Sequence, residues 1–339
     1  MRIAVVGTGL IGTSIGLDLR RLGHEVVGHD VDAERAATAR ARGALDAVAP
    51  TLEGLWNPAP DLVVVAAPPR ATIELLGRIP PAFLAMDVAG VKVPILAAAG
   101  ERRFVGTHPM AGRERSGPEA ASASLFRGAT WVVVPGSAAP ADLTLVVDLV
   151  RRLGANPVEM TAADHDAAVA RISHLPQILA AALVDLAAAD PGAFALAAGS
   201  LRDLTRVAMS EPGIWVELLG ANEEAVATAI DEFVERLLAY RARLGNGDRL
   251  GEDLARARRL REGLAAPVTP VRVALADRPG ELAKVGRALA ATAVDVRDLQ
   301  LRHAPYGGGG VLTIAVRPGE AAPLVDALAA EGLEVIGGR

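Results

Sequence analysis

A short glycine-rich segment near the N-terminus constrains the fold of this chain more than any other feature. An apolar run, residues 3–7, leads into Gly7, Thr8, Gly9, Leu10, Ile11 and Gly12, and a helical pattern follows at once. The first glycine suits a tight turn, the second lets the backbone approach a pyrophosphate, and the third allows close helix–strand packing. The free N–H groups of the helix start favour an anion. The segment therefore predicts a strand–turn–helix unit that binds a dinucleotide.

The pattern continues as an alternation of short apolar runs with helical segments. Seven segments are predicted as strands: 3–7, 25–30, 61–68, 83–90, 102–108, 130–136 and 156–160. Several of them are apolar throughout, which is typical of strands covered by helices on both faces. We therefore expect an α/β Rossmann domain, with a doubly wound and mostly parallel sheet, over residues 1–160.

Strand patterns stop near residue 161 and return near residue 271. Residues 161–264 are rich in Ala and Leu with helical periodicity, which predicts an all-α domain. Its wide apolar helix faces favour burial against a second copy, hence a homodimer, over a single well-packed bundle. Residues 265–270 form a predicted linker. Residues 271–339 show the order βαββαβ, which predicts a small ferredoxin-like module.

Composition limits the classes of partner. The chain of 339 residues has no cysteine and a formal net charge of −5. The absence of cysteine excludes disulfides and thiolate metal sites, and it fits a cytoplasmic protein. The charge favours neither nucleic acid nor an anionic membrane as partner, and no apolar run approaches the roughly 20 residues of a membrane span. We expect a small-molecule substrate and no metal.

The identity of the dinucleotide depends on Asp30, which ends the second predicted strand 18 residues after Gly12. A carboxylate there accepts hydrogen bonds from the ribose hydroxyls and repels a 2′-phosphate, so NAD is favoured over NADP. Arg35 nearby could weaken that exclusion. Ala67, Pro68 and Arg70, which follow the third predicted strand, are also expected at the cofactor.

Oxidation of an alcohol with NAD needs a base, and histidine is the best candidate. His24 and His29 lie in the first βα unit and His303 in the C-terminal module, which leaves His108, His165 and His174. His108 follows a late Rossmann strand, where ligands of open α/β sheets bind, although a loop histidine bonded to backbone would fit the same pattern. We expect His165 to belong to the cap at a helix start. There is no lysine between 93 and 283, which argues against dehydrogenases with a catalytic lysine in the helical domain.

Several motifs together carry a family resemblance. In chain order they are GTGLIGTS, DVAGVK (87–92), GTHPMAGRERSG (106–117), SHLP (173–176) and LRDLTRVA (201–208). Over residues 1–245 the chain resembles the prephenate/arogenate dehydrogenase family of tyrosine biosynthesis. The C-terminal module, with its ADRPGELA turn (276–283), resembles an ACT domain.

The resemblance implies oxidative decarboxylation of a cyclohexadienyl acid, with His108 as the base for the ring 4-hydroxyl. Arg206 matches the family's carboxylate-binding arginine, a role that suits a guanidinium; a surface ion pair with Asp203 is the alternative. Glu114 matches an acidic residue that gates the site. Further residues expected at the substrate are Ser116, Ser173, His174, Gln177 and Gly90.

Two positions depart from the family pattern. Gly90 stands where many prephenate-using members have a serine that orients the catalytic histidine, and Gln177 stands where many have a second histidine. Catalysis remains compatible with both changes, because an amide still forms hydrogen bonds. Substrate preference stays open among prephenate, which we rank first, arogenate and a 4-amino analogue.

The ACT-like module implies regulation by an amino acid at the first strand–helix turn, formed by Asp277, Arg278, Pro279 and Gly280. Tyrosine as that effector follows from pathway logic alone, and a module that only adds subunit contacts is the alternative. Two other classes of function remain: another NAD(P)-dependent reductase, and a non-catalytic sensor of dinucleotide and amino acid.

Overall fold

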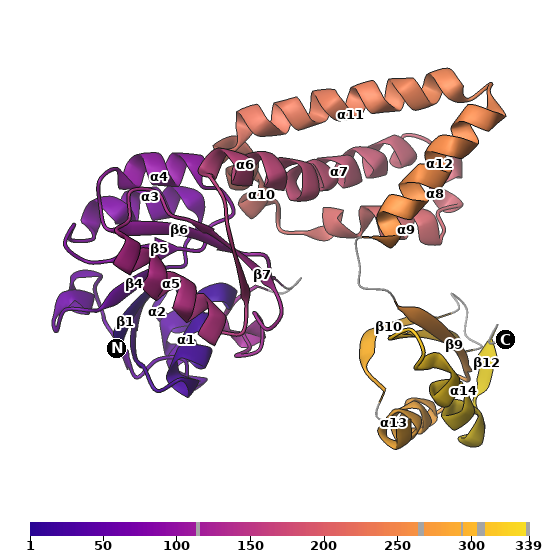
Figure 1. Cartoon of the computed structure of the whole chain (residues 1–339), viewed down its shortest axis with the longest axis horizontal. Helices are drawn as coiled ribbons and strands as arrows, with labels where there is room; N and C mark the ends of the chain where they lie inside the picture. Colours follow the sequence, from indigo (N-terminus) through magenta and orange to yellow (C-terminus); the bar gives the residue numbers. More distant parts are fainter. Residues whose placement is uncertain (113–115, 264–267, 293, 304–308, 337–339) are drawn as a thin grey trace. The chain divides into compact units, whose positions relative to one another are not determined.

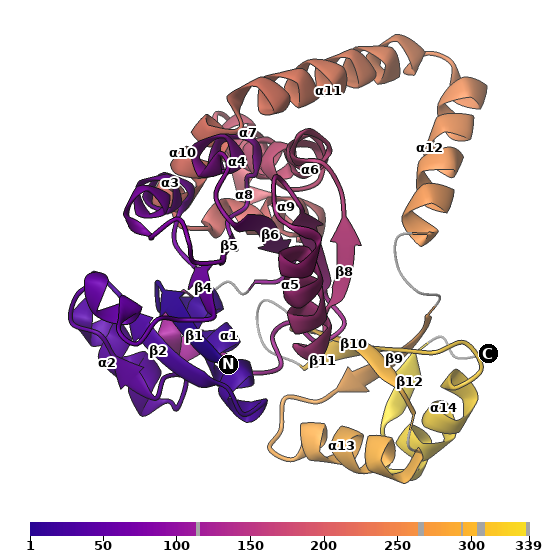
Figure 2. The same cartoon turned by 60° about the vertical axis from the view of Figure 1, so that its left-hand side comes forward.

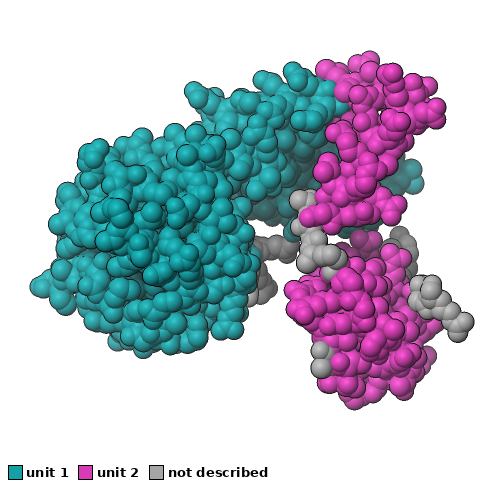
Figure 3. Space-filling model, viewed as in Figure 1, with its two compact units in different colours: residues 1–236 teal, residues 237–339 magenta. Residues whose placement is uncertain are grey.

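The computed structural model describes the whole chain except residues 113–115, 264–267, 293, 304–308 and 337–339. The chain divides into two compact units, Met1–Arg236 and Leu237–Arg339, shown in two colours in Figure 3. Residues 265–267 of the predicted linker 265–270 lie outside the described residues, and residues 269–270 already belong to a strand rather than to a linker. The domain boundaries at 160 and 264 stay predictions.

The first unit begins with an eight-stranded sheet of order β3-β2-β1-β4-β5-β6-β7-β8. Its strands are β1 (Arg2–Val6), β2 (Glu25–His29), β3 (Ala47–Val48), β4 (Leu62–Val65), β5 (Ala85–Asp87), β6 (Phe104–Pro109), β7 (Thr130–Val134) and β8 (Asn156–Glu159). The sheet is parallel from β3 to β6, and β7 runs antiparallel to β6 and parallel to β8. The predicted Rossmann-like, mostly parallel sheet is confirmed. The sequence pattern missed β3, whose two residues are too few to show a period.

Helices cover both faces of this sheet, as Figures 1 and 2 show. They are α1 (Leu10–Arg21), α2 (Ala33–Ala41), η1 (Glu53–Trp56), α3 (Pro69–Arg78), α4 (Val93–Ala99), η2 (Pro118–Ala120) and α5 (Pro140–Arg152). Alternate residues of β1 point to opposite faces: Ile3 and Val5 join the core beneath α1 and α5, and Ala4 and Val6 join the core beneath α3 and α4. Burial on both sides explains why these strands are apolar throughout.

The rest of the first unit is helical, as predicted. Its elements are α6 (Ala162–Val169), η3 (Ala170–His174), α7 (Leu175–Ala188), α8 (Pro191–Ala195), α9 (Gly199–Thr205), η4 (Arg206–Met209), α10 (Pro212–Ala221) and the first part of α11 (Glu223–Arg243). α6 and α7 are joined through the π-helical turn η3. Pro176 has no N–H to donate to the preceding turn, and such an interruption is a usual cause of an irregular turn within a helix.

Among the described residues, one continuous helical stretch, Ala162–Ala188, has the length and composition to cross a membrane, and 28% of its most apolar window is buried. This stretch also carries the buried polar residues His165, Asp166 and His174. Helices of a protein core pass the same test of length and composition, so we assign it no membrane role.

The second unit contains the end of α11, then α12 (Gly247–Glu262), and a module with the predicted βαββαβ order. The module consists of β9 (Thr269–Leu275), α13 (Glu281–Thr292), β10 (Val296–His303), β11 (Gly310–Val316), α14 (Ala321–Ala330) and β12 (Glu334–Ile336). Its sheet is antiparallel with the order β10-β11-β9-β12. Both helices pack on one face of it, where Val285 of α13 and Leu328 of α14 share a core with Val273 and Ile314 of the sheet. The small antiparallel sheet is therefore confirmed.

Candidate active site

The glycine-rich turn has the geometry that a dinucleotide requires. Gly7 has φ +93°, and a Cβ on it would lie 2.3 Å from the carbonyl oxygen of Ala66. A Cβ on Gly12 would lie 2.0 Å from the carbonyl oxygen of Gly7, so α1 can pack this closely only with glycine there. Gly9 has open space within 4 Å of where its Cβ would be. A close-packed turn with an open approach over Gly9 fits a pyrophosphate at the start of α1.

Asp30 is fixed at the end of β2 beside this turn. Its Oδ2 accepts hydrogen bonds from the Thr8 backbone N–H at 2.6 Å and the Thr8 hydroxyl at 2.9 Å, and its Oδ1 accepts from the Asp32 N–H at 2.9 Å. Arg35 pairs with Asp32 at 3.3 Å. The turn and the carboxylate expected to recognise the ribose are thus held together, which fits NAD.

The residues predicted after the third strand begin α3. Ala67 accepts a hydrogen bond from the Thr72 hydroxyl at 3.0 Å, and Pro68 precedes the first turn of the helix. The Arg70 backbone N–H donates to Glu217 of α10 at 2.5 Å, and the Arg70 side chain pairs with Glu74. A carboxylate from the helical part therefore binds the start of α3.

His108 lies near the end of β6, where a buried ion pair anchors the strand. Asp87, at the end of β5, accepts a hydrogen bond from the Thr107 N–H at 3.0 Å and forms an ion pair with Lys92. Both charged side chains are fully buried. Because a buried charge is costly unless paired and hydrogen-bonded, this arrangement fixes β6 against β5 one residue before His108.

Behind His108 lies a second histidine and then a carboxylate. Nδ1 of His108 is 2.9 Å from Nε2 of His165, and Nδ1 of His165 is 2.7 Å from Oδ1 of Asp166. Asp166 also accepts hydrogen bonds from the backbone N–H groups of Lys92 at 2.7 Å and Val93 at 2.8 Å. The expectation that His165 belongs to a helix cap was wrong: Thr161 caps α6, and the His165 ring reaches the predicted base.

A third histidine is held by the helical part. The Asn222 side-chain amide donates to the Asp166 backbone carbonyl at 2.9 Å and lies 3.2 Å from Nδ1 of His174. The Trp215 ring meets His174 edge to face, with centroids 6.2 Å apart. One turn further along, Gln177 is buried, and its Oε1 has no hydrogen-bond partner among the described residues. An unsatisfied buried acceptor of this kind is suited to a donor on a ligand.

The electrostatics favour neutral histidines here. Burial, reinforced by the charge of Lys92 and by the neighbouring histidines His165 and His174, lowers the pKa of His108 well below its ordinary value. Burial also lowers the pKa of His174, against the opposing charge of Asp166. Near pH 7 His108 is therefore unprotonated, the form that a general base needs.

Gly90 lies directly beside His108. A Cβ at this position would be 3.8 Å from Nε2 of His108 and 3.0 Å from Cδ2 of Leu218. Gly90 therefore lies next to His108. Leu218 fills part of the space that a larger side chain at position 90 would take.

The structure brings the other predicted substrate residues together only in part. Ser173 is half-buried in η3 beside His174, Ser116 is exposed, and Arg206 is exposed at the start of η4, which packs against α7. Glu114 lies outside the described residues. Asp166 and Asn222 join the site although the sequence analysis did not single them out, because both are placed by contacts between segments far apart in the chain. Lys92 lies in the motif DVAGVK (87–92), but the sequence assigned it no role.

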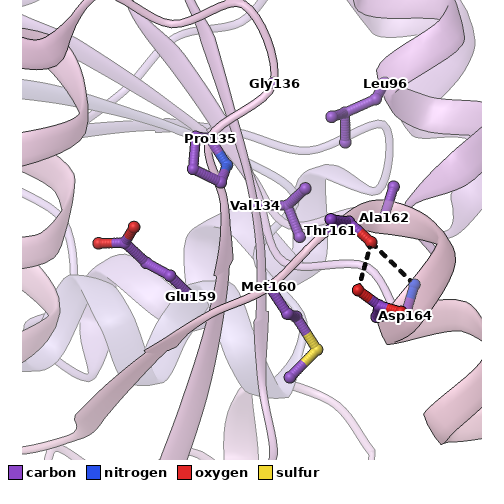
Figure 4. A pocket seen from close by; sticks show the side chains of 9 residues that line it. All are labelled: Leu96, Val134, Pro135, Gly136, Glu159, Met160, Thr161, Ala162 and Asp164. Atoms are coloured by element: carbon purple, nitrogen blue, oxygen red, sulfur yellow. Dashed lines mark hydrogen bonds between the residues drawn. The ribbon is translucent and has the colours of Figure 1, made fainter.

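One cavity lies apart from these residues. It has a volume of about 630 Å³ and is lined by Leu96, Val134, Pro135, Gly136, Glu159, Met160, Thr161, Ala162 and Asp164 (Figure 4). None of the described residues predicted for the site lines it. In Figure 4 Thr161 bonds Asp164, the helix cap named above.

Comparison with known protein families assigns the chain to one of them. Residues 15–159 match the prephenate dehydrogenase nucleotide-binding domain, and residues 161–258 match the prephenate dehydrogenase dimerization domain. The chain is also 33% identical to the probable prephenate dehydrogenase NovF of Streptomyces niveus, over 97% of this chain and 98% of that protein. The chain belongs to the prephenate dehydrogenase family.

Solved structures agree with this assignment. The prephenate dehydrogenase of Aquifex aeolicus, in complex with hydroxyphenyl propionate and NAD+, is 27% identical, with a TM-score of 0.73 over 78% of this chain and 98% of that one. The arogenate dehydrogenase of Synechocystis is 29% identical, with a TM-score of 0.69 over 78% of this chain and 100% of that one. Solved structures of a prephenate dehydrogenase and of an arogenate dehydrogenase are thus both similar to this chain.

Proposed function

We propose that this protein catalyses the NAD-dependent oxidative decarboxylation of prephenate to 4-hydroxyphenylpyruvate. The observation that carries the proposal is the neutral His108, which projects from β6 with Nε2 toward Gly90 and Nδ1 toward His165. The family assignment and the geometry of the glycine-rich turn support the same reaction.

In this reaction His108 takes the proton of the ring 4-hydroxyl at Nε2. NAD, when bound at the turn of Gly7, Gly9 and Gly12, supplies the acceptor for the hydride of the same carbon. Loss of CO2 from the ring carboxylate then forms the aromatic ring, and the phenolate oxygen takes the proton back from His108, so the substrate loses one hydride and CO2 overall. Aromatisation makes this step strongly downhill, and an aligned neutral histidine is the only base that the chemistry needs.

The helical part binds the substrate. Arg206 anchors a carboxylate, and His174, whose Nδ1 faces the Asn222 amide, presents Nε2–H as a donor. Gln177 bonds the substrate side chain, Ser173 and Ser116 complete the polar lining, and Glu114 gates access. These roles belong to the proposal together with His108 as the base.

Arogenate is the alternative substrate, since its side-chain ammonium would satisfy the free Oε1 of Gln177. The test is NADH formation with prephenate, arogenate and 3-hydroxyisobutyrate in parallel. We expect turnover with prephenate to exceed that with arogenate and 3-hydroxyisobutyrate to be inert. A folded protein that oxidises neither cyclohexadienyl acid would contradict the proposal and favour the sensor.

The role of Arg206 has its own test. Arg206→Ala should raise KM for prephenate by about 10²-fold while changing kcat far less, because a charge-assisted bidentate pair contributes about 1.5–3 kcal/mol. Arg202→Ala, a change of an exposed arginine on the preceding helix α9, is the matched control. An unchanged KM in Arg206→Ala would refute the anchor.

The remaining assignments concern assembly and regulation. Exposed apolar side chains on the helical part, such as Leu186, Leu196, Met209 and Val216, would be covered in a homodimer. The C-terminal module would act as an ACT-like domain that binds tyrosine near Asp277, where Gly280 (φ +95°) makes the turn before α13. Kinetics with and without tyrosine test this, and no change would leave the module a role in subunit contacts. A cytoplasmic location remains part of the proposal.

A further inference from the structure

Three ionisable side chains form a line that ends at the proposed base. Asp166, His165 and His108 are joined by contacts of 2.7 and 2.9 Å, and the first two side chains are buried. They come from β6 and from two adjacent positions of α6, which are more than 50 residues apart in the chain. His165 touches the imidazole on the nitrogen opposite the one beside Gly90.

The hydrogen-bond roles along this line follow from its carboxylate end. An ionised Asp166 can only accept, and it already accepts from the backbone of Lys92 and Val93. Nδ1 of His165 must then carry a proton, and in a ring with one proton Nε2 is an acceptor. Nδ1 of His108 must donate to that acceptor, so the lone pair of His108 lies on Nε2.

On the side of His108 that faces Gly90, none of the described residues supplies this orientation. Gly90 has no side chain with which to bond Nε2, and the nearest side-chain atom to its virtual Cβ is a methyl of Leu218. Within the described residues, the His108 ring forms its hydrogen bond with His165. In the part of the chain that the structure describes, His108 is therefore oriented through its Nδ1, by the contact with His165.

We propose that His165, itself fixed by Asp166, is a positioning residue that holds His108 in the tautomer with its lone pair on Nε2. The inference rests on the proposed function for its kinetic consequence, but the tautomer exists whether or not the substrate has been identified correctly. His165 does not touch the substrate. It sets which nitrogen of His108 is basic and where that nitrogen points, as a carboxylate does behind the histidine of a serine protease triad.

The tautomer is measured directly in the wild-type protein. With 15N-labelled histidine, long-range proton–nitrogen NMR separates Nδ1–H from Nε2–H rings, and His108→Asn assigns the signal. We expect His108 and His165 both to carry their protons on Nδ1 at about pH 7.5. A His108 ring protonated on Nε2 would overturn the proposal even if prephenate is turned over.

The kinetic arm uses two replacements of the same residue. His165→Leu removes the acceptor and should lower kcat about 10²–10³-fold with KM for prephenate changed less than about threefold. His165→Gln keeps an acceptor oxygen and should recover kcat to within about tenfold of wild type. His24→Gln, which replaces a buried histidine in the first βα unit, should leave kcat within about twofold and controls for loss of a buried ring.

Two kinetic outcomes contradict the proposal. A wild-type kcat in His165→Leu would show that His108 does not need His165 to orient its ring. Equal losses of kcat in His165→Leu and His165→Gln would show that His165 only fills space. If the wild-type protein oxidises neither cyclohexadienyl acid, the proposed function fails while the NMR result still decides the tautomer.

Discussion

The glycine-rich nucleotide turn and the histidine site both lie in the unit Met1–Arg236, but they are built in opposite ways. The turn is a single segment in which backbone and missing side chains matter: Gly7 and Gly12 leave no room for a Cβ, and Gly9 leaves an open approach. The histidine site is assembled from β5, β6, α6 and the C-terminal end of α10, and each of these contacts involves at least one side chain. The first can be recognised from local spacing, whereas the second exists only after folding.

This difference has an energetic side. A Cβ in the turn would collide with backbone, so the fold itself depends on these glycines. The histidine site instead buries polar groups that bond one another, so a replacement that keeps the hydrogen bond should alter the chemistry more than the fold. Substitutions in the two regions should therefore separate activity from stability.

The largest expected effect is on turnover. His108→Asn removes the base while keeping a polar side chain, and kcat should fall by about 10³-fold or more, since general-base catalysis contributes about 10²–10⁴-fold. NAD affinity, measured by fluorescence titration, should stay within about twofold because the turn is untouched. Appreciable residual turnover would show that another group takes the proton.

The turn offers a matched pair of substitutions. Gly12→Ala places a Cβ 2.0 Å from the Gly7 carbonyl oxygen and should lower the free energy of unfolding by about 2–3 kcal/mol. Gly9→Ala meets nothing within 4 Å and should leave stability within about 0.5 kcal/mol while weakening NAD binding. Denaturant unfolding and NAD titration check both variants. Equal stability of the two would refute the close-packing argument.

The pH dependence tests the buried histidines. Because burial lowers the pKa of His108, kcat/KM should be level above about pH 6.5 and fall about tenfold per pH unit only below the lowered pKa. The unfolded chain binds more protons than the folded one below about pH 6.5, so the free energy of unfolding should decrease as the pH falls through that range. An acid limb near pH 7 or above would show that His108 is not desolvated.

The smallest effect is expected at Gly90. A Cβ there lies 3.0 Å from Leu218, a flexible side chain that can shift, so Gly90→Ala should cost about 1 kcal/mol or less. Gly90→Ser adds a hydroxyl within reach of Nε2 of His108 and should change kcat by less than about fivefold, because His165 already orients the ring. Comparison of the two variants isolates the hydroxyl, and a large gain from serine would show that orientation from behind is incomplete.

Much of this architecture was predictable because it is periodic. The seven apolar strand segments, the helical part and the βαββαβ order of the module each follow from local patterns, whereas the two-residue strand β3 is too short to show one. At the site, His108 could be proposed from its place at the end of a predicted strand, which the structure has as β6. His165 could not, since its neighbour Asp166 and its start-of-helix context resemble an ordinary helix cap.

By itself the sequence determined the sheet, the turn that suits a dinucleotide, and the position of one histidine near the end of a strand, since these follow from local patterns in the chain. Only the tertiary structure decided that Asp166 and His165 stand behind His108, that Lys92 pairs with Asp87 beneath it, and that Asn222 meets His174. The physical reason is that a buried polar group must find a partner, and the fold brings those partners from distant segments.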